Sequence, residues 1–149
     1  MLLRALEEQF GIAELPVGVF VQNAKGKVYV VNRDVERVPY ESLFIDALGL
    51  YLGGWQADGF RLSMEGSQLL AGSATRGFFV VDDDGRHAWL RGEDLPCALE
   101  GSSFLIVVHG RTGDVLGSGK VRQPREGERG GALVVNFVPK ARRLVVVNA

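Results

Sequence analysis

From Gly77 onward, short apolar segments follow one another with turn residues between them, and this pattern limits the possible folds more than any other feature. Many short strands at close spacing are typical of a small barrel. We therefore predict a closed or nearly closed barrel in this half of the chain, with one short helical turn at Gly85–Leu90. The predicted strands are Phe78–Val81, Leu95–Leu99, Phe104–His109, Val115–Arg122, Ala132–Val138 and Arg143–Val147.

The residues before Gly77 mix the two kinds of periodicity. Leu2, Leu6 and Phe10 have helical spacing, and Gly11 is placed to end that helix. We predict further helices over Asn32–Val38, Glu41–Leu52 and Met64–Leu70, and strands over Val17–Val21, Lys27–Val31 and Phe60–Ser63. Asn23–Gly26 predicts a turn between the first two strands. The fold class is therefore α+β, with a small α+β domain over residues 1–74 and a β pseudo-barrel domain over residues 75–149.

The charge is distributed unevenly along the chain. The formal net charge is −1, which by itself argues against a nucleic-acid partner. Residues 1–100 contain 9 Lys and Arg against 15 Asp and Glu, whereas residues 101–149 contain 8 against 3. A basic end on an otherwise acidic chain indicates either a surface that faces nucleic acid or a solvated surface that is basic by chance.

The titratable residues give little support to a metal or redox site. A single cysteine, Cys97, excludes an internal disulfide, and His87 and His109 do not complete a typical zinc site with it. We predict no cofactor. The first residues have no long apolar region typical of a signal peptide, and no segment approaches the length of a membrane span, so we expect a cytoplasmic protein without a membrane partner.

Enzyme activity is a weak alternative. Such an enzyme would use Asp82–Asp84 and His87. The three aspartates suggest a magnesium site, but aspartates at the end of a strand usually bond the backbone of the turn that follows. Gly117–Lys120 resembles part of a phosphate-binding loop, yet Asp114 replaces its first glycine and Val121 its magnesium-binding hydroxyl. These glycines instead indicate a strand where another backbone approaches closely. We therefore predict no catalytic residues.

Basic residues cluster late in the chain and form the predicted binding site. Lys120 and Arg122 are two residues apart, so a regular strand places both on one face, and the same spacing relates Lys140 to Arg142. If those strands are neighbours, the two pairs converge on one patch that contacts phosphates. The predicted RNA-binding residues are Lys120, Arg122, Arg125, Lys140, Arg142 and Arg143.

Aromatic residues that stack on bases would strengthen an assignment to RNA. Trp89 and Phe137 are the candidates, and the alternative is that both belong to the core, where apolar rings of a small barrel usually lie.

Two motifs resemble the PUA domain, the small RNA-binding module named after pseudouridine synthases and archaeosine transglycosylases. They are Leu90-x-Gly92 after the helical turn and Leu116-Gly117-x-Gly119 before a basic strand end. With Lys27–Val31 and Phe60–Leu62 upstream, the order of elements is similar to the Nip-seven family of ribosome-biogenesis factors, which pair an N-terminal pre-PUA domain with a C-terminal PUA domain.

The resemblance implies a non-catalytic factor that binds rRNA through the PUA domain during assembly of the large ribosomal subunit. The chain length and the absence of a basic run for nuclear import favour an archaeal member of the family. Its protein partners would be other ribosome-assembly factors. The alternative function is an adaptor that targets an RNA-modifying enzyme, such as an rRNA methyltransferase, through the apolar face predicted for Glu41–Leu52.

Overall fold

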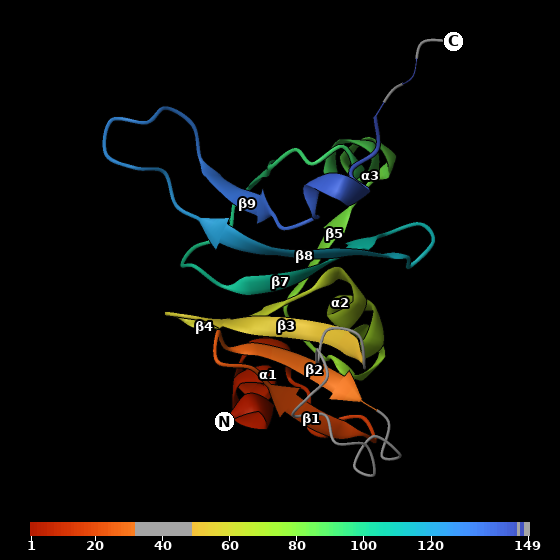
Figure 1. The fold of residues 1–149 in the computed structure, drawn as a ribbon. Helices are drawn as coiled ribbons and strands as arrows, with labels where there is room; N and C mark the ends of the chain where they lie inside the picture. The colour runs from red at the N-terminus through yellow and green to blue at the C-terminus, as the bar shows by residue number, and fades with distance from the viewer. Residues whose placement is uncertain (32–48, 146, 148–149) are drawn as a thin grey trace.

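The computed structural model describes residues 1–31, 49–145 and 147 (Figure 1). Within them the chain forms an α+β fold that combines a four-stranded antiparallel sheet, a curled five-stranded half-barrel and three α-helices. The elements are α1 (Leu2–Phe10), β1 (Val19–Gln22), β2 (Lys27–Val31), β3 (Leu50–Gln56), β4 (Gly59–Leu62), α2 (Met64–Leu70), η4 (Ala71–Ser73), β5 (Phe78–Val81), α3 (Asp83–Leu90), β6 (Leu95–Cys97), β7 (Phe104–His109), β8 (Val115–Arg122), β9 (Ala132–Asn136) and η5 (Lys140–Arg142).

The first sheet has the strand order β1-β2-β3-β4, and its local signals agree with the sequence. Helix α1 ends at Gly11, which adopts the left-handed conformation (φ 66°) that glycine reaches without steric cost. The predicted hairpin is confirmed, because β1 and β2 pair with Val19 opposite Val31. The side chain of Asn23 closes the turn by accepting hydrogen bonds from the backbone N–H groups of Lys25 and Lys27.

The helix predicted over Glu41–Leu52 is wrong for its last residues. Residues 41–48 lie outside the described part of the chain, as does the predicted helix over Asn32–Val38. Residues 50–52 belong to β3, which pairs with β2 on one side and β4 on the other. Gly53 lies inside this strand and does not end a helix. Glycine is needed there because a Cβ would come 2.2 Å from the carbonyl oxygen of Arg61 on the neighbouring strand β4.

The second sheet has the strand order β5-β7-β8-β9-β6, with β5 and β7 parallel and the other pairs antiparallel. The predictions for β5, β7 and β8 are confirmed, and β6 and β9 end two residues earlier than predicted. Helix α3 confirms the helical turn predicted at Gly85–Leu90 and begins two residues before it. Gly119 admits the close approach expected from the glycine pair, because a Cβ there would lie 2.7 Å from Val135 O and 2.8 Å from Trp89 Cη2.

The strand predicted over Arg143–Val147 is wrong. The short 3-10 helix η5 (Lys140–Arg142) ends directly before this segment, and none of the described residues after η5 is in a strand. Two contacts explain the difference: the N–H of Leu144 donates to Leu90 O (2.8 Å), and Arg143 Nε donates to Val138 O (3.1 Å). The segment therefore bonds to α3 and to the end of β9 instead of adding a strand to the sheet.

The two sheets lie against each other and share a core (Figure 1). Strand β4 contacts β7 and β8, while α2 packs against β3, β4 and β8. The cluster formed by α1, β2, β3, β4 and α2 also contains Phe104 and Ile106 of β7. Ser118 Oγ of β8 donates to Leu62 O of β4 at 2.5 Å. The division into two domains at residue 74 stays a prediction, because the two sheets share buried side chains.

A second apolar cluster fills the half-barrel around Trp89 of α3, which is fully buried. Helix α3 contacts β5, β6 and β8. Among the described residues, no helix combines the length and the apolar character needed to cross a membrane.

Candidate nucleic-acid interface

Strand β8 presents two cations on the outer face of the half-barrel. Lys120 and Arg122 are half-buried and alternate with the buried Val121, so their two-residue spacing places them on a common face as predicted. Lys120 pairs with Val135 of β9 and Arg122 with Leu133. Arg125 follows on the exposed β8–β9 connection, which projects from the body of the protein in Figure 1. These three residues form one group at the carboxyl end of β8.

The other three predicted residues form a separate group. Lys140 and Arg142 belong to η5, so the prediction that a second strand carries them is wrong. Strands β8 and β9 are antiparallel, and Arg122 lies opposite Leu133 near the start of β9. Lys140 and Arg142 follow the end of β9, so the two groups lie toward opposite ends of this strand pair. Arg143 has a structural role. Its side chain packs against Gly92, where a Cβ would come 2.3 Å from Arg143 Cδ, and Arg143 Nε donates to Val138 O.

Carboxylates face three of the six cations. Lys120 pairs with Asp58 and Arg142 with Glu65, while Arg122 Nη1 lies 3.2 Å from Glu128 Oε2. Arg125, Lys140 and Arg143 have no carboxylate partner among the described residues. Exposed ion pairs of this kind contribute about 0–1 kcal/mol, so a phosphate can replace the carboxylate at little cost.

The environment of Glu128 shows how these acids hold the connection in place. The backbone N–H of Arg125 and the guanidinium of Arg122 both donate to Glu128, and they lower the pKa of its carboxyl group. The acid remains ionised at neutral pH and competes for Arg122 with any phosphate that binds there.

Two hollows lie beside Phe137, and the cations of β8 line one of them. The first, which we call the outer hollow, has a volume of about 330 Å³, and its lining includes Lys120, Arg122, Val135 and Phe137. The second, the junction hollow, has a volume of about 340 Å³ where the two sheets meet, and its lining includes Tyr51, Arg61, Glu65 and Phe137. Phe137 lines both hollows, so it joins the outer hollow to the junction hollow.

Arg61 is a functional candidate that sequence analysis missed. It lies on β4, and its guanidinium carbon is 3.8 Å from the centroid of the Phe137 ring, a close cation–π stack. Burial lowers the pKa of Arg61, although a guanidinium remains charged in proteins. No carboxylate among the described residues pairs with it. In the sequence it was a basic residue within a predicted strand and within the Phe60–Leu62 match of the resemblance, and neither signal separates it from other surface arginines.

The two aromatic candidates have different environments. Trp89 is core, since its side chain is buried and its Nε1 donates to Leu116 O at 3.0 Å. It therefore cannot stack on a base. Phe137 is half-buried and packs against the first core cluster while it lines both hollows.

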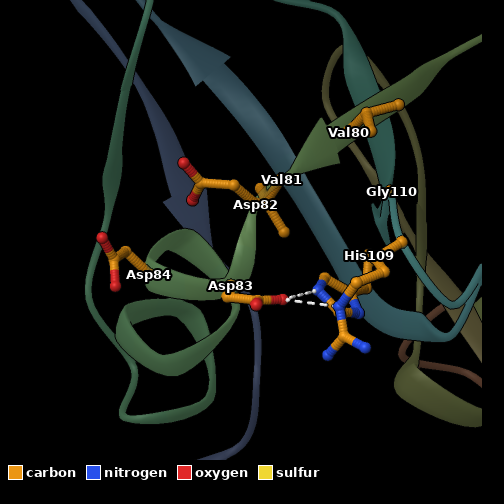
Figure 2. Close-up of a pocket in the computed structure, with 8 residues that line it drawn as sticks. Val80, Val81, Asp82, Asp83, Asp84, His109 and Gly110 are labelled. Carbon is orange, nitrogen blue, oxygen red and sulfur yellow. Dashed lines mark hydrogen bonds and ion pairs between the residues drawn. The ribbon is translucent and has the colours of Figure 1, made fainter.

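The acidic cluster at the start of α3 lies beside a third, open hollow of about 680 Å³, shown in Figure 2. Asp82 caps α3 by accepting from the N–H of Gly85 at 2.7 Å. Asp83 accepts from Nε2 of the buried His109 at 2.6 Å, and Asp84 points away from that histidine. The aspartates do not converge with His87, as the enzyme alternative would require: His87 is exposed on α3, and the histidine beside Asp83 is His109 of β7.

The Asp83–His109 contact predicts a pH-dependent contribution to stability. The hydrogen bond from His109, followed by that from Arg111, lowers the pKa of Asp83 below its ordinary value of 3.8. When a carboxyl group has a lower pKa in the folded protein than in the unfolded chain, its ionised form stabilises the fold. This stabilisation is complete above the pKa of the unfolded chain and is lost as the pH falls through the pKa of the folded protein. We expect Asp83→Asn to destabilise the protein by a constant amount above about pH 5 and by a shrinking amount below 3.8.

Urea unfolding followed by circular dichroism at several pH values measures this difference. Asp84→Asn is the matched control, because no hydrogen bond joins Asp84 to another described side chain. A difference between wild type and Asp83→Asn that stays constant into the acid range would contradict the assignment.

Among the described residues, no group of three or more His, Cys, Asp or Glu side chains is arranged to hold a metal ion. Comparison of the sequence with protein-family models and with curated proteins finds no match. The β8–β9 face and the two hollows beside it are the features that bear on function.

Proposed function

We propose that the protein is a non-catalytic RNA-binding factor that acts in the cytoplasm on rRNA during assembly of the large ribosomal subunit. The half-barrel is then a PUA-like domain, in line with the resemblance of Leu90-x-Gly92 and Leu116-Gly117-x-Gly119 to that module. The curled sheet with α3 packed against it is compatible with this assignment. No described feature favours the adaptor function, because residues 41–48 of its predicted surface lie outside the described chain.

One observation carries the proposal. Lys120 and Arg122 extend from one face of β8 beside an apolar floor that contains Val135 and Phe137. Cations next to apolar and aromatic surface suit RNA, whose phosphates need positive charge and whose bases need stacking partners. Their carboxylate partners are exposed, so phosphate can displace them.

Arg122→Glu is expected to weaken binding of a fluorescein-labelled, uridine-rich RNA by about tenfold or more, since it removes a cation that faces a phosphate and adds repulsion. The slope of log K against log salt should also fall in magnitude, by about 0.7 for each phosphate of a single strand that the variant no longer neutralises. Fluorescence anisotropy over a salt series measures both quantities.

Two controls separate this effect from damage to the fold. Arg4→Glu removes an exposed pair of the same kind, Arg4 Nε to Glu8 Oε1 at 3.0 Å on α1, and should leave RNA affinity unchanged. Glu128→Gln should tighten binding, because it removes the acid that competes for Arg122. Equal affinities of wild type and Arg122→Glu at low salt would refute the proposed surface.

A further inference from the structure

Phe137 lies at the centre of a continuous path across the molecule. Its backbone N–H donates to Ser118 O (3.2 Å) just beyond the end of β9, and the residue lines both the outer hollow and the junction hollow. The outer hollow belongs to the half-barrel, whereas Tyr51 and Arg61 of the junction hollow come from β3 and β4. A ligand that fills both hollows therefore touches both sheets.

Cations and aromatic rings alternate along this path. Lys120 and Arg122 line the outer hollow and Phe137 follows. Arg61 then stacks on the Phe137 ring from the junction side. Beyond it, Lys27 Nζ lies 5.8 Å from the centroid of the Tyr51 ring.

The charge along the path is mainly positive. Glu65, the acid that lines the junction hollow, is already paired with Arg142 of η5. Arg61 is half-buried and has no carboxylate partner among the described residues. A half-buried cation without an acid beside it favours an anionic ligand. Arg142 itself lines neither hollow and meets the path only through its pair with Glu65.

We propose that the two hollows together hold one single strand of RNA, which runs from Arg122 past Phe137 to Tyr51. This inference rests on the proposed function and extends it to the first half of the chain, for which the sequence had suggested a protein-facing surface. Arg61 lines only the junction hollow, so we place one base of the strand against Phe137 from the outer hollow. The phosphates on either side of that base then lie near Lys120 and Arg61.

The alternation selects a single strand over a duplex. Base faces are available for stacking only where they are not already stacked within a helix, and single strands bind where a positive groove is lined with aromatic rings. A duplex would contact such a surface through its phosphates and 2′-hydroxyls, and would gain nothing from Phe137 or Tyr51.

The test compares binding of a labelled uridine-rich RNA with binding of the same RNA annealed to its complement. Wild type is expected to favour the single strand by about tenfold or more, since each stacked base contributes strongly to affinity. Phe137→Leu and Arg61→Gln should each weaken single-strand binding by about tenfold and leave the weaker duplex binding unchanged. Phe78→Leu, which alters an exposed ring on β5 outside both hollows, should change neither affinity.

The outcomes separate this inference from the proposed function. If wild type binds neither RNA, both are overturned. If Arg122→Glu loses affinity while Phe137→Leu and Arg61→Gln keep it, the single-strand path is wrong and the proposed function stands. A preference for the duplex also overturns the path. Phe137 packs against the core, so thermal unfolding of each variant is measured as well, and Arg61→Gln decides if Phe137→Leu fails to fold.

Discussion

Replacement of Trp89 by alanine is expected to lower the free energy of unfolding by about 3–5 kcal/mol. The side chain is fully buried in the half-barrel, its Nε1 donates to Leu116 O, and the ring fills the space that Gly119 leaves open. The substitution removes that apolar volume, leaves a cavity and leaves a buried carbonyl without its partner. Urea denaturation followed by far-ultraviolet circular dichroism measures the loss.

Trp89→Phe is the matched control. It keeps most of the ring but not the N–H group, so we expect a smaller loss of about 1–3 kcal/mol from the unpaired Leu116 carbonyl. RNA affinity of the folded Phe variant should equal that of wild type, because the ring does not reach the outer face of β8. Loss of RNA affinity without loss of stability would show that Trp89 contacts RNA after all.

The second large effect concerns Asn136, a buried amide at the end of β9. Its Nδ2 donates to the carbonyl oxygens of Trp89 (2.7 Å) and Glu93 (3.0 Å), and its Oδ1 accepts from the N–H of Val138 (2.7 Å). Asn136→Leu keeps a similar volume but leaves three backbone groups without these partners. Trp89 O still accepts from the N–H of Gly92 (2.9 Å), so two groups, Glu93 O and the Val138 N–H, are left unpaired. Because each unpaired buried group costs about 1–3 kcal/mol, we expect the free energy of unfolding to fall by about 2 kcal/mol or more.

The same substitution should also weaken RNA binding, because Asn136 precedes Phe137 and its bonds fix the chain that positions that ring. Asn23→Ala is the matched control, since Asn23 Oδ1 also accepts two backbone hydrogen bonds but on an exposed hairpin. We expect that control to lose about 1 kcal/mol at most, because water replaces the bonds. Equal losses in the two variants would show that burial of the amide is not the cause.

Local structure was predictable wherever neighbours in sequence decide it. Gly11 ends α1 because its own backbone reaches the left-handed conformation, and Asn23 closes the first hairpin through bonds to residues two and four positions away. The common face of Lys120 and Arg122 follows from the two-residue period of a strand. None of these features needs a contact with a distant part of the chain.

The segment over residues 50–52 shows where this approach fails. Its apolar residues fit a helix that runs on from residue 41 and also fit a short buried strand, because periodicity alone does not separate the two over a few residues. Pairing with β2 and β4 on both sides decides for the strand. The prediction for Arg143–Val147 fails for a similar reason, since its β-branched residues suit a strand but Leu144 bonds to α3.

One part of the candidate site was predictable from the sequence and the other part was not. Spacing placed Lys120 and Arg122 together, but no pattern linked Arg61 to Phe137, which are far apart in the sequence. They meet because β4 packs against β8, with Ser118 bonded to Leu62, and because the end of β9 turns Phe137 toward that contact.

The sequence by itself therefore determined the α+β class, most of the strands and one pair of outward cations, since hydrogen bonds and side-chain alternation within a few residues govern these. Only the tertiary structure decided that Trp89 is core, that Asp83 bonds His109 instead of converging with His87, and that Arg61 shares a surface with Phe137. Each of these outcomes depends on which distant segments pack together, and the stabilising contacts exist only after the two sheets have met.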